Sequence, residues 1–314
     1  MHRLIAAITA LTAIGGVASA LAQPAPMGER RTISEICDEC VWEKAVTCRG
    51  FIEGVNFDAQ GTMWMVGYLT GEILKVEGDQ CITVGEAGGA PNGAKFGPDG
   101  KFVVADRQRG LMSVDPETGE RTLMVGQIKT EQFRGLNDLA FDAEGGIYFT
   151  EPYGSNAVDR TGRVFYVAPG EEKVAQLYIN GMSFPNGVAV GPNGQYIYIS
   201  EYGQNRIIAA PGFKPASIHN TPYVFARLEG GVGPDGLTVD SEGNVYAAHF
   251  GAGEVVIFDS NGFEYGKLRL PEGAGNFTTN LALHDGYLYV TEATQNIVWR
   301  IKVKKQPVAA KPAQ

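Results

Sequence analysis

A short turn motif recurs six times along the 314-residue chain and limits the folds that the chain can adopt. Each copy places an aspartate or asparagine within the three residues before a glycine, between an apolar segment and one rich in aromatic and β-branched residues. The closing glycines, 39 to 49 residues apart, are Gly61, Gly100, Gly145, Gly194, Gly243 and Gly286. This spacing is typical of four-stranded propeller blades, and the flanking pattern is that of β-hairpins.

A third strand follows the hairpins, as in residues 71–76, 162–167 and 254–258, whereas amphipathic helical runs are hard to find. The 42 glycines amount to roughly twice the average usage of about 7%, which favours many tight turns. We therefore expect an all-β fold: a six-bladed β-propeller of four-stranded blades over residues 45–303. The last blade has three strands before the chain ends, so a segment near residues 45–51 is expected to add the fourth and close the ring.

The two ends of the chain differ from the repeats. A charged start followed by an apolar run from Leu4 to Ala22 predicts a secretory signal peptide at residues 1–22, cleaved near Ala22. The run is too short for a stable membrane span, and no later segment predicts a membrane anchor. We expect a periplasmic or secreted protein. Residues 304–314, rich in Lys, Pro, Ala and Gln, predict a flexible tail.

Four cysteines lie at Cys37, Cys40, Cys48 and Cys81, the first two in an N-terminal segment, residues 23–44, that precedes the propeller. In an exported protein they favour two structural disulfides, for which three pairings are possible. A bridge from Cys48 to Cys81, or another pairing, would help to fasten the closing strand. Cys37 and Cys40 also have the spacing of a redox pair or half a zinc site, but no second such pair or nearby histidine completes one.

The formal net charge of -9 and the lack of a basic cluster argue against nucleic acid or an anionic membrane as a partner. A neutral or cationic small molecule, or a metal cation, fits this charge better. The sequence also lacks a nucleophile elbow, a phosphate-binding glycine loop and an HExxH zinc motif.

Oxygen-bearing side chains recur at one register of the repeat. Five of them stand eight residues before a closing glycine, and Asn280 stands six before; the set is Glu53, Asn92, Asn137, Asn186, Asp235 and Asn280. Equivalent positions of a propeller surround its axis, so these six side chains are expected to converge at the central channel. Asn and Asp also recur because they cap turns, which is the structural alternative, but Glu53 is a poor turn former. Carboxylates and amides without sulfur or imidazole describe a hard-cation site of the Ca²⁺ type.

A second set of polar residues stands about six positions after the closing glycines and is expected to surround the same opening: Asp106, Glu151, Glu201, His249 and Glu292. Tyr153, Tyr202 and Phe250 lie beside them in the sequence and are candidates for contact with a substrate. His249 is a candidate for proton transfer if it faces the site, because a histidine titrates near neutral pH. An exposed loop histidine is the alternative.

Four segments in this order and spacing resemble the gluconolactonase and regucalcin (senescence marker protein) family: residues 51–54, 136–142, 184–189 and 233–237. The similarity covers about residues 51–303. It implies that Glu53, Asn186 and Asp235 bind a divalent ion, that Asn137 contacts the ion or the substrate, and that Asp235 is a general base. Sugar-lactone relatives carry an arginine two residues before Asn137, where this chain has Gly135 with Arg134 beside it.

The resemblance implies a metal-dependent lactonase that hydrolyses a cyclic ester at the opening of the central channel, with Ca²⁺ as the expected ion. Asp235, His249 or a hydroxide on the ion would take the proton. The expected substrate contacts are Asn137, Arg134, Glu151, Tyr153 and Tyr202. The alternatives are hydrolysis of a phosphotriester or another ester at the same ion, or a non-catalytic binding or scaffold propeller in which the ion stiffens the ring.

Overall fold

The computed structural model describes residues 31–86, 88–171, 173–213 and 221–308. The predicted signal peptide, residues 1–22, lies outside them, as does the end of the predicted tail, residues 309–314. In this part of the chain the helices are two short 3-10 turns, η1 (Ile33–Glu35) and η2 (Tyr202–Gln204), and none is long and apolar enough to cross a membrane.

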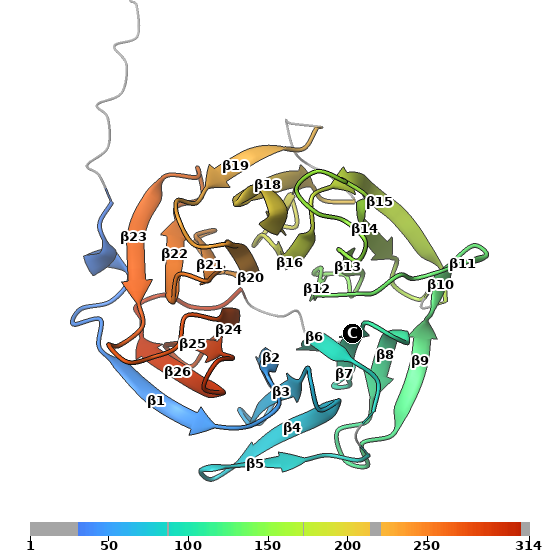
Figure 1. The fold of residues 1–314 in the computed structure, drawn as a ribbon, viewed down its shortest axis with the longest axis horizontal. Helices are drawn as coiled ribbons and strands as arrows, with labels where there is room; N and C mark the ends of the chain where they lie inside the picture. Colours follow the sequence, from blue (N-terminus) through green and yellow to red (C-terminus); the bar gives the residue numbers. More distant parts are fainter. Residues whose placement is uncertain (1–30, 87, 172, 214–220, 309–314) are drawn as a thin grey trace, which may run out of the picture. The chain divides into compact units, whose positions relative to one another are not determined.

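Six four-stranded antiparallel sheets surround a common axis, which confirms the predicted six-bladed propeller (Figure 1). The innermost strands are β2 (Ile52–Phe57), β6 (Pro91–Phe96), β12 (Leu139–Phe141), β16 (Pro185–Val190), β20 (Gly233–Val239) and β24 (Thr278–His284). The second strands are β3 (Met63–Gly67), β7 (Phe102–Asp106), β13 (Ile147–Glu151), β17 (Tyr196–Glu201), β21 (Val245–Phe250) and β25 (Tyr287–Glu292). An innermost strand begins where its antiparallel second strand ends, and we call this edge of the blades the site end of the ring.

The two outer strands complete each blade. The third strands are β4 (Glu72–Glu77), β8 (Gly110–Val114), β14 (Gly162–Val167), β18 (Arg206–Pro211), β22 (Glu254–Phe258) and β26 (Ile297–Lys302). The outermost strands are β5 (Gln80–Thr83), β9 (Arg121–Val125), β15 (Ala175–Met182), β19 (Tyr223–Arg227), β23 (Glu264–Arg269) and β1 (Trp42–Thr47). A small hairpin of β10 (Gln127–Ile128) and β11 (Glu131–Gln132) follows blade two.

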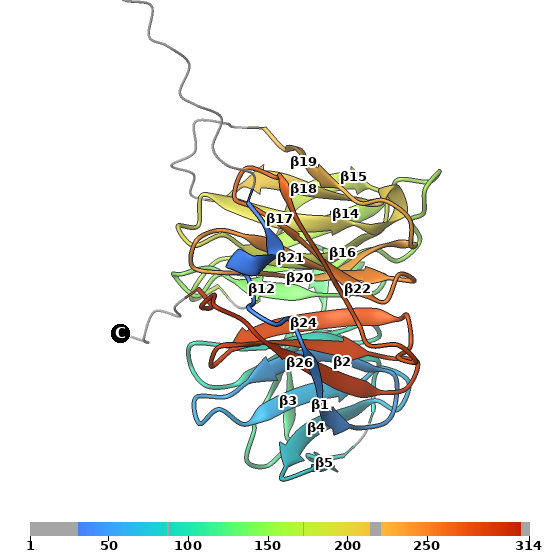
Figure 2. The ribbon, with the colours of Figure 1, turned by 90° about the vertical axis from the view of Figure 1, so that its left-hand side faces the viewer.

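The N-terminal strand β1 closes the ring by pairing with β26, the third strand of blade six (Figure 2). It begins at Trp42, so the predicted boundary at residue 45 is three residues late. Ile36 and Cys37 are also buried in the core between blades five and six. The described part of the N-terminal segment therefore belongs to the propeller, because its apolar side chains complete that core.

Two disulfides join Cys37 to Cys40 and Cys48 to Cys81, which settles the pairing. Cys48 directly follows β1 and Cys81 lies in β5, so this bridge ties the closing strand of blade six to the outermost strand of blade one. The bridge closes a loop with a sequence separation of 33 residues. Closing a loop of that size in the unfolded chain stabilises a fold by about 3 to 4 kcal/mol.

Three of the repeated aspartates are turn caps that also anchor aromatic side chains. Asp58 accepts hydrogen bonds from the backbone N–H of Gln60 and Thr62, and its second oxygen accepts one from Trp64 Nε1 at 2.9 Å. Asp240 accepts bonds in the same way, including one from the Tyr246 hydroxyl. Asp142 accepts a bond from the Tyr166 hydroxyl, so the turns of blades one, three and five are fixed to buried aromatic side chains.

The predicted tail is anchored over residues 304–308, so its start at 304 is wrong. The backbone N–H of Lys304 donates to the carbonyl of Ile36, and Pro307 forms a bridge with Asp240. The Lys305 ammonium is buried and lies 2.7 Å from the Glu242 carboxylate. These contacts hold the chain against the turn of blade five.

Candidate functional site

The six polar residues predicted to converge on the axis, here called the ring residues, lie at the site end of the propeller, where the innermost strands are irregular. In five blades the pairing of the innermost and second strands shifts register there, beginning at Glu53, Pro91, Pro185, Pro234 and Thr278. A β-bulge bends a strand and re-aims a side chain, and bulges are common beside active sites. Asn280 lies within the irregular part of β24 despite its different spacing in the sequence.

The ring side chains are almost withdrawn from solvent. Five are buried, with 3 to 7% of their surface exposed: Glu53, Asn92, Asn186, Asp235 and Asn280. Asn137, just before β12, is half-buried. The structure thus brings the three predicted ion ligands, Glu53, Asn186 and Asp235, to one end of the ring on three innermost strands.

Glycines after the ring residues let neighbouring innermost strands touch. A Cβ atom on Gly187 would lie 2.3 Å from the carbonyl oxygen of Asp235, and one on Gly93 would lie 2.6 Å from the Cα of Asp138. No side chain fits at such distances, so glycine is required by the close packing around the axis.

The carboxylates of the ring perturb one another. Burial raises the pKa of Glu53 to about 8, and the negative charge of Asp138 adds to the rise. Burial also raises the pKa of Asp235 well above its usual value, with the charges of Glu53 and Asp138 acting in the same direction. Three acidic groups therefore share a poorly solvated region at the axis.

Several oxygens of this region have no hydrogen-bond partner among the described residues: Glu53 Oε2, Asp138 Oδ1 and Asn186 Oδ1. An unsatisfied buried polar group costs about 1 to 3 kcal/mol, and more if it is charged. The described part of the chain has no group of three or more His, Cys, Asp or Glu side chains arranged to hold a metal ion. The ring offers a different donor set, two carboxylates with amide oxygens, which fits a hard cation.

Two residues of this region were missed by the sequence reasoning. Asp138 is buried in the position where four other blades have glycine, and this exchange was the available signal. Lys95 lies in β6, and the negative charge of Asp138 partly offsets the lowering of its pKa by burial. Lys95 therefore lies close enough to Asp138 to compensate part of the acidic charge.

Hydroxyl groups connect the innermost strands around the ring. The Thr150 hydroxyl accepts from the N–H of Asp138 and donates to the carbonyl of Asn186 at 2.6 Å, which links blades three and four. Thr279 donates to the carbonyl of Ile52 at 2.9 Å and links blades six and one. These bonds fix the backbone on which the ring residues are carried.

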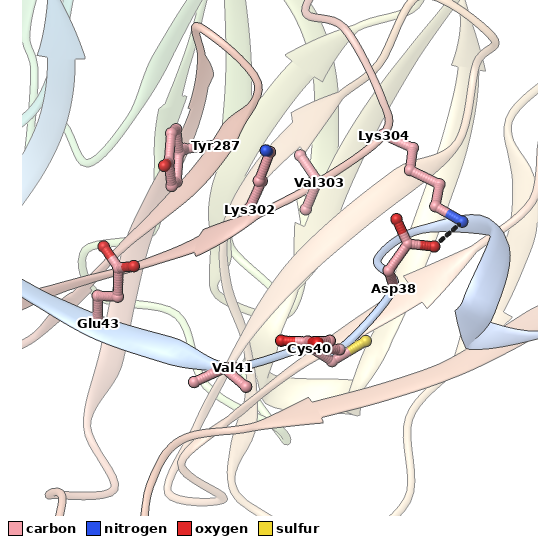
Figure 3. A pocket seen from close by; sticks show the side chains of 9 residues that line it. Asp38, Cys40, Val41, Glu43, Tyr287, Lys302, Val303 and Lys304 are labelled. Atoms are coloured by element: carbon pink, nitrogen blue, oxygen red, sulfur yellow. Dashed lines mark ion pairs between the residues drawn. The ribbon is translucent and has the colours of Figure 1, made fainter.

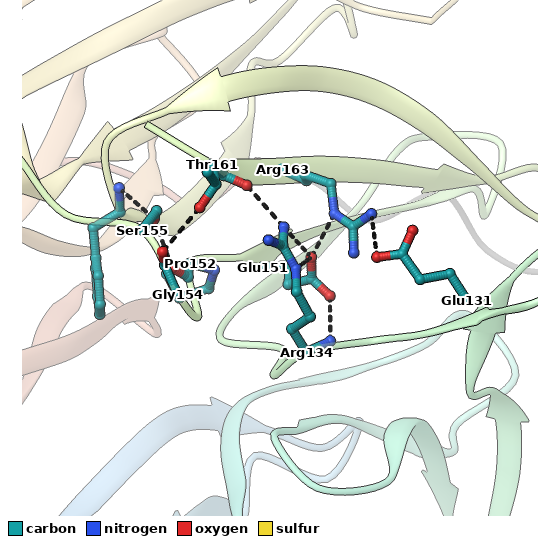
Figure 4. A network of polar contacts seen from close by, with 9 residues as sticks. Glu131, Arg134, Glu151, Pro152, Gly154, Ser155, Thr161 and Arg163 are labelled. Atoms are coloured by element: carbon teal, nitrogen blue, oxygen red, sulfur yellow. Dashed lines mark hydrogen bonds and ion pairs between the residues drawn. The ribbon is translucent and has the colours of Figure 1, made fainter. Parts of the chain in front are cut away.

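Glu151 and Arg134, both expected to contact substrate, belong to an ionic network in which Glu151 is buried and Arg134 is exposed (Figure 4). Glu151 is fully buried, and its Oε2 lies 3.0 Å from Arg134 Nη2 and 2.6 Å from Arg163 Nε. Its other oxygen accepts the backbone N–H of Arg134 at 2.6 Å. Glu151 thus fastens the loop before blade three, and its carboxylate is already paired.

The other carboxylates expected around the opening have the same structural task. The carboxylate of Asp106 accepts hydrogen bonds from the backbone N–H groups of Ala90 and Arg109. Glu201 accepts one from Ser183, and Glu292 accepts two, from Thr294 and Gln295. All three carboxylates are buried. These residues end second strands at the site end, but each carboxylate turns inward to satisfy loop backbone and does not face the opening as a free group.

His249 takes this position in blade five and is also fully buried. Its Nδ1 lies 3.3 Å from Glu254 Oε1, and its Nε2 faces Gly231, where a Cβ would lie 2.5 Å away. Burial lowers the pKa of His249, and the nearby Glu254 carboxylate only partly opposes this. A neutral, enclosed imidazole is poorly placed for exchange of protons with a substrate.

The predicted aromatic residues stay partly accessible. Tyr153 is 50% exposed, and Tyr202 and Phe250 are half-buried. Tyr202 lies in η2, whose backbone packs against Gly233 at the start of β20. Burial and the negative charge of Asp235 raise the pKa of Tyr202 to about 12, so this tyrosine lies near the ring carboxylates.

A cavity of about 420 Å³ lies away from the ring, between the N-terminal segment and the end of β26 (Figure 3). Charged side chains line it, and Asp38 and Lys304 form an ion pair across its edge. The ring supplies the unpaired buried oxygens and the perturbed carboxylates, and we therefore place the candidate site there rather than in this cavity.

Comparison with known proteins gives the same fold and a consistent set of relatives. The lactonase drp35 of Staphylococcus haemolyticus is 27% identical over 233 residues, which cover 70% of this chain and 70% of that protein. The structure of a gluconolactonase from Xanthomonas campestris matches with a TM-score of 0.75 at 21% identity, over 87% of this chain and 94% of that one. The calcium-binding protein regucalcin from Agrobacterium tumefaciens matches with a TM-score of 0.69 at 22% identity, over 84% and 95%.

The relatives that are named lactonases support a lactone-hydrolysing function. A sequence model of the SMP-30/Gluconolactonase/LRE-like region matches residues 51–294, from just before β2 to just after β25. This range contains all six ring residues and five complete blades. The chain belongs to the SMP-30/gluconolactonase/LRE-like family.

Proposed function

We propose that the protein is an exported lactonase that depends on a divalent cation, Ca²⁺ in the first instance, held by Glu53, Asn186 and Asp235. The observation that carries the proposal is the pair of buried carboxylates, Glu53 and Asp235, beside buried oxygens that have no hydrogen-bond partner among the described residues. The pKa of both carboxyls is raised by burial, and the negative charge of Glu53 adds to the rise at Asp235. A bound hard cation would offset the free-energy cost of burying these two charged carboxylates, and hard cations such as Ca²⁺ are bound by oxygen ligands. The name of the structural neighbour regucalcin, a calcium-binding protein, agrees with this choice of ion.

When bound, the cation supplies positive charge for the carbonyl oxygen of the lactone and for the oxyanion that forms on it. The chain's own residues do the rest. Asp235 accepts the proton of the attacking water, because its carboxylate is buried near Tyr202 and forms no ion pair with any of the described residues. Asn137 contacts the substrate, since it is the half-buried member of the ring. His249 is not assigned to this step, because it is enclosed by Gly231 and Glu254.

Replacement of Asp235 by Asn tests the assignment by measuring lactone turnover together with bound calcium. We expect turnover to fall about 100- to 10,000-fold, in the range of general-base removal, while some calcium stays bound. Asp99→Asn, at an exposed turn, is the matched control. Full activity with calcium retained would exclude Asp235 as the base. If calcium raises the melting temperature but the protein hydrolyses none of the lactones, the ion has a structural role and the proposed activity is wrong.

Export is proposed from two features of the chain. The N-terminal sequence has the pattern of a cleavable signal peptide, and all four cysteines are in disulfides. Such bonds persist in oxidising compartments and are rare in a reducing cytosol. Fractionation of cells expressing the full chain, with mass measurement of the mature N-terminus, tests it: a product starting near Gln23 is expected, and an uncleaved chain confined to the cytosol contradicts export.

A further inference from the structure

Six aromatic side chains form a connected belt at the site end of the ring. They come from blades one, four, five and six and are Phe51, Tyr68, Phe184, Tyr202, Phe250 and Phe277. Ring centroids are 5.6 Å apart for Phe51 and Tyr68, and 6.4 Å apart for Phe51 and Phe277. Phe277 stacks on Phe250 at 4.4 Å and 17°, and the series continues through Tyr202 to Phe184 at 6.1 and 5.3 Å.

The belt is not part of the hydrophobic core. All six side chains are half-buried, and none belongs to the six core clusters that fill the spaces between blades. Aromatic side chains that contact one another while partly exposed keep apolar surface in water, and such patches mark binding sites. The sequence reasoning found Tyr202 and Phe250 but not the connection among the six.

Two members of the belt are held in an unusual backbone conformation. Phe51 and Phe184 have φ values of 58° and 53°, a region that bulky residues rarely adopt. Each stands two residues before a ring residue, Glu53 in blade one and Asn186 in blade four. Conformations of this kind cost about 1 to 3 kcal/mol and persist where the surroundings impose them, often at ligand sites.

The belt is continued on blades two and three by Arg107 and Tyr153. The Arg107 guanidinium lies 4.3 Å from the ring centre of Tyr68 and 5.8 Å from that of Tyr153. Gly135 makes room for them: a Cβ there would lie 3.0 Å from both Arg107 Cγ and Tyr153 Cβ. The position two residues before Asn137 therefore presents a tyrosine face and no polar side chain of its own.

The belt is poorly suited to a polyhydroxylated ligand. Recognition of several sugar hydroxyls needs carboxylates, amides or guanidinium groups aimed at them. At the site end the described carboxylates of the second strands are turned into the loops. The Arg107 guanidinium is engaged by the Tyr68 hydroxyl and lies over the rings of Tyr68 and Tyr153, and the belt itself offers phenyl and phenol rings. An apolar ring or chain on the substrate would instead cover this surface.

From this arrangement we infer that the substrate is a lactone carrying an aryl or alkyl group. This group packs on the aromatic belt while the ester lies at the polar ring residues. The inference rests on the proposed lactonase function. It names a substrate class that differs from sugar lactones.

Hydrolysis rates of three lactone types test the inference: a benzo-fused aryl lactone, a series of γ-alkyl lactones, and glucono-δ-lactone. We expect kcat/KM to rise about three- to fourfold for each added methylene until the belt is covered, as burial of a CH₂ group predicts. We expect the aryl lactone to exceed glucono-δ-lactone by 100-fold or more in kcat/KM. Equal or greater activity on glucono-δ-lactone overturns the inference while leaving the lactonase proposal intact; no hydrolysis of any lactone overturns both.

Variants then locate the effect. Phe250→Ala and Phe277→Ala are expected to lower kcat/KM for the aryl lactone about tenfold, mainly through KM, with bound calcium unchanged. Phe277→Leu should restore part of the loss, because it returns apolar area. The control is Phe263→Ala, because Phe263 lies in an outer turn and is 74% exposed. If the two belt variants change the rates on all substrates equally, or match the control, the belt does not select the substrate.

Discussion

At the scale of single residues, the balance of charge at the ring axis decides what the site can do. Glu53, Asp138 and Asp235 are buried, and Lys95 compensates only near Asp138. Acidic groups in this state keep their protons to higher pH than usual, and a divalent ion must displace those protons to bind. Cation binding and pH should therefore be linked.

Stability without the ion is expected to fall as pH rises from about 4.3, the usual pKa of a glutamate in an unfolded chain, to about 8. In this window folded Glu53 keeps a proton that the unfolded chain has lost, and stability falls with pH whenever the folded state binds more protons. Added Ca²⁺ should therefore raise the melting temperature more at pH 8 than at pH 5. Glu53→Gln should reduce both the pH dependence and the response to Ca²⁺, and an equal response at both pH values would contradict this.

His249 is expected to be structural. His249→Gln should destabilise the fold by about 1 to 3 kcal/mol, because a buried group bonded to Glu254 is replaced, while the pH profile of turnover stays the same. Urea unfolding and a pH profile of kcat distinguish the roles. If His249→Gln flattens the acidic or basic side of the pH profile of kcat and leaves the free energy of unfolding unchanged, His249 moves a proton during turnover.

At the scale of elements, the bulged innermost strands carry the site. Their glycines permit contact between adjacent blades, and the bulges direct the ring side chains to the axis. The need for glycine at these contacts between blades can be tested at two positions of one segment, Gly187 within β16 and Gly191 just after it.

Gly187→Ala should cost about 1 to 3 kcal/mol, because its Cβ would lie 2.3 Å from the carbonyl oxygen of Asp235 and the backbone would have to move. It should also weaken cation binding, since Asp235 is displaced. Gly191→Ala, whose Cβ meets its nearest neighbour at 3.3 Å, is the control and should be milder on both measures. Equal loss in both variants would mean that the close approach around the axis is not what matters.

The two disulfides should contribute unequally to stability. Replacement of Cys48 and Cys81 by serine should cost about 3 to 4 kcal/mol, roughly twice the cost at Cys37 and Cys40, because the loops have sequence separations of 33 and 3. Denaturant unfolding of both double variants measures the difference. A larger loss at Cys37 and Cys40 would show that the bridge within the N-terminal segment, and not the tie to blade one, fastens the closing strand.

The sequence alone predicts the number of blades, the register of the ring and the closing strand, because turn residues and strand patterns are local signals. It does not predict the role of Glu151, since a carboxylate on a strand end looks the same whether it faces solvent or pairs with Arg134 and Arg163. It also misses the aromatic belt, whose members Phe51 and Phe277 lie far apart in the chain and meet only when the ring closes. Tertiary pairing decided both outcomes.

At the scale of the whole molecule, closure by β1 brings blade one beside blade six and completes both the ring and the belt. Every ring residue comes from a different blade, so the site exists only in the closed propeller. We propose that these six polar residues hold a divalent cation used for lactone hydrolysis.

The decisive experiment is a titration of Ca²⁺ into chelator-treated protein, in which a pH indicator follows the initial rate of hydrolysis of an aryl lactone. We expect negligible turnover without the ion, saturable recovery as Ca²⁺ binds, and no recovery in the Glu53→Gln, Asp235→Asn double variant. Turnover that is unaffected by chelation, or recovered equally by the double variant, would contradict the proposal.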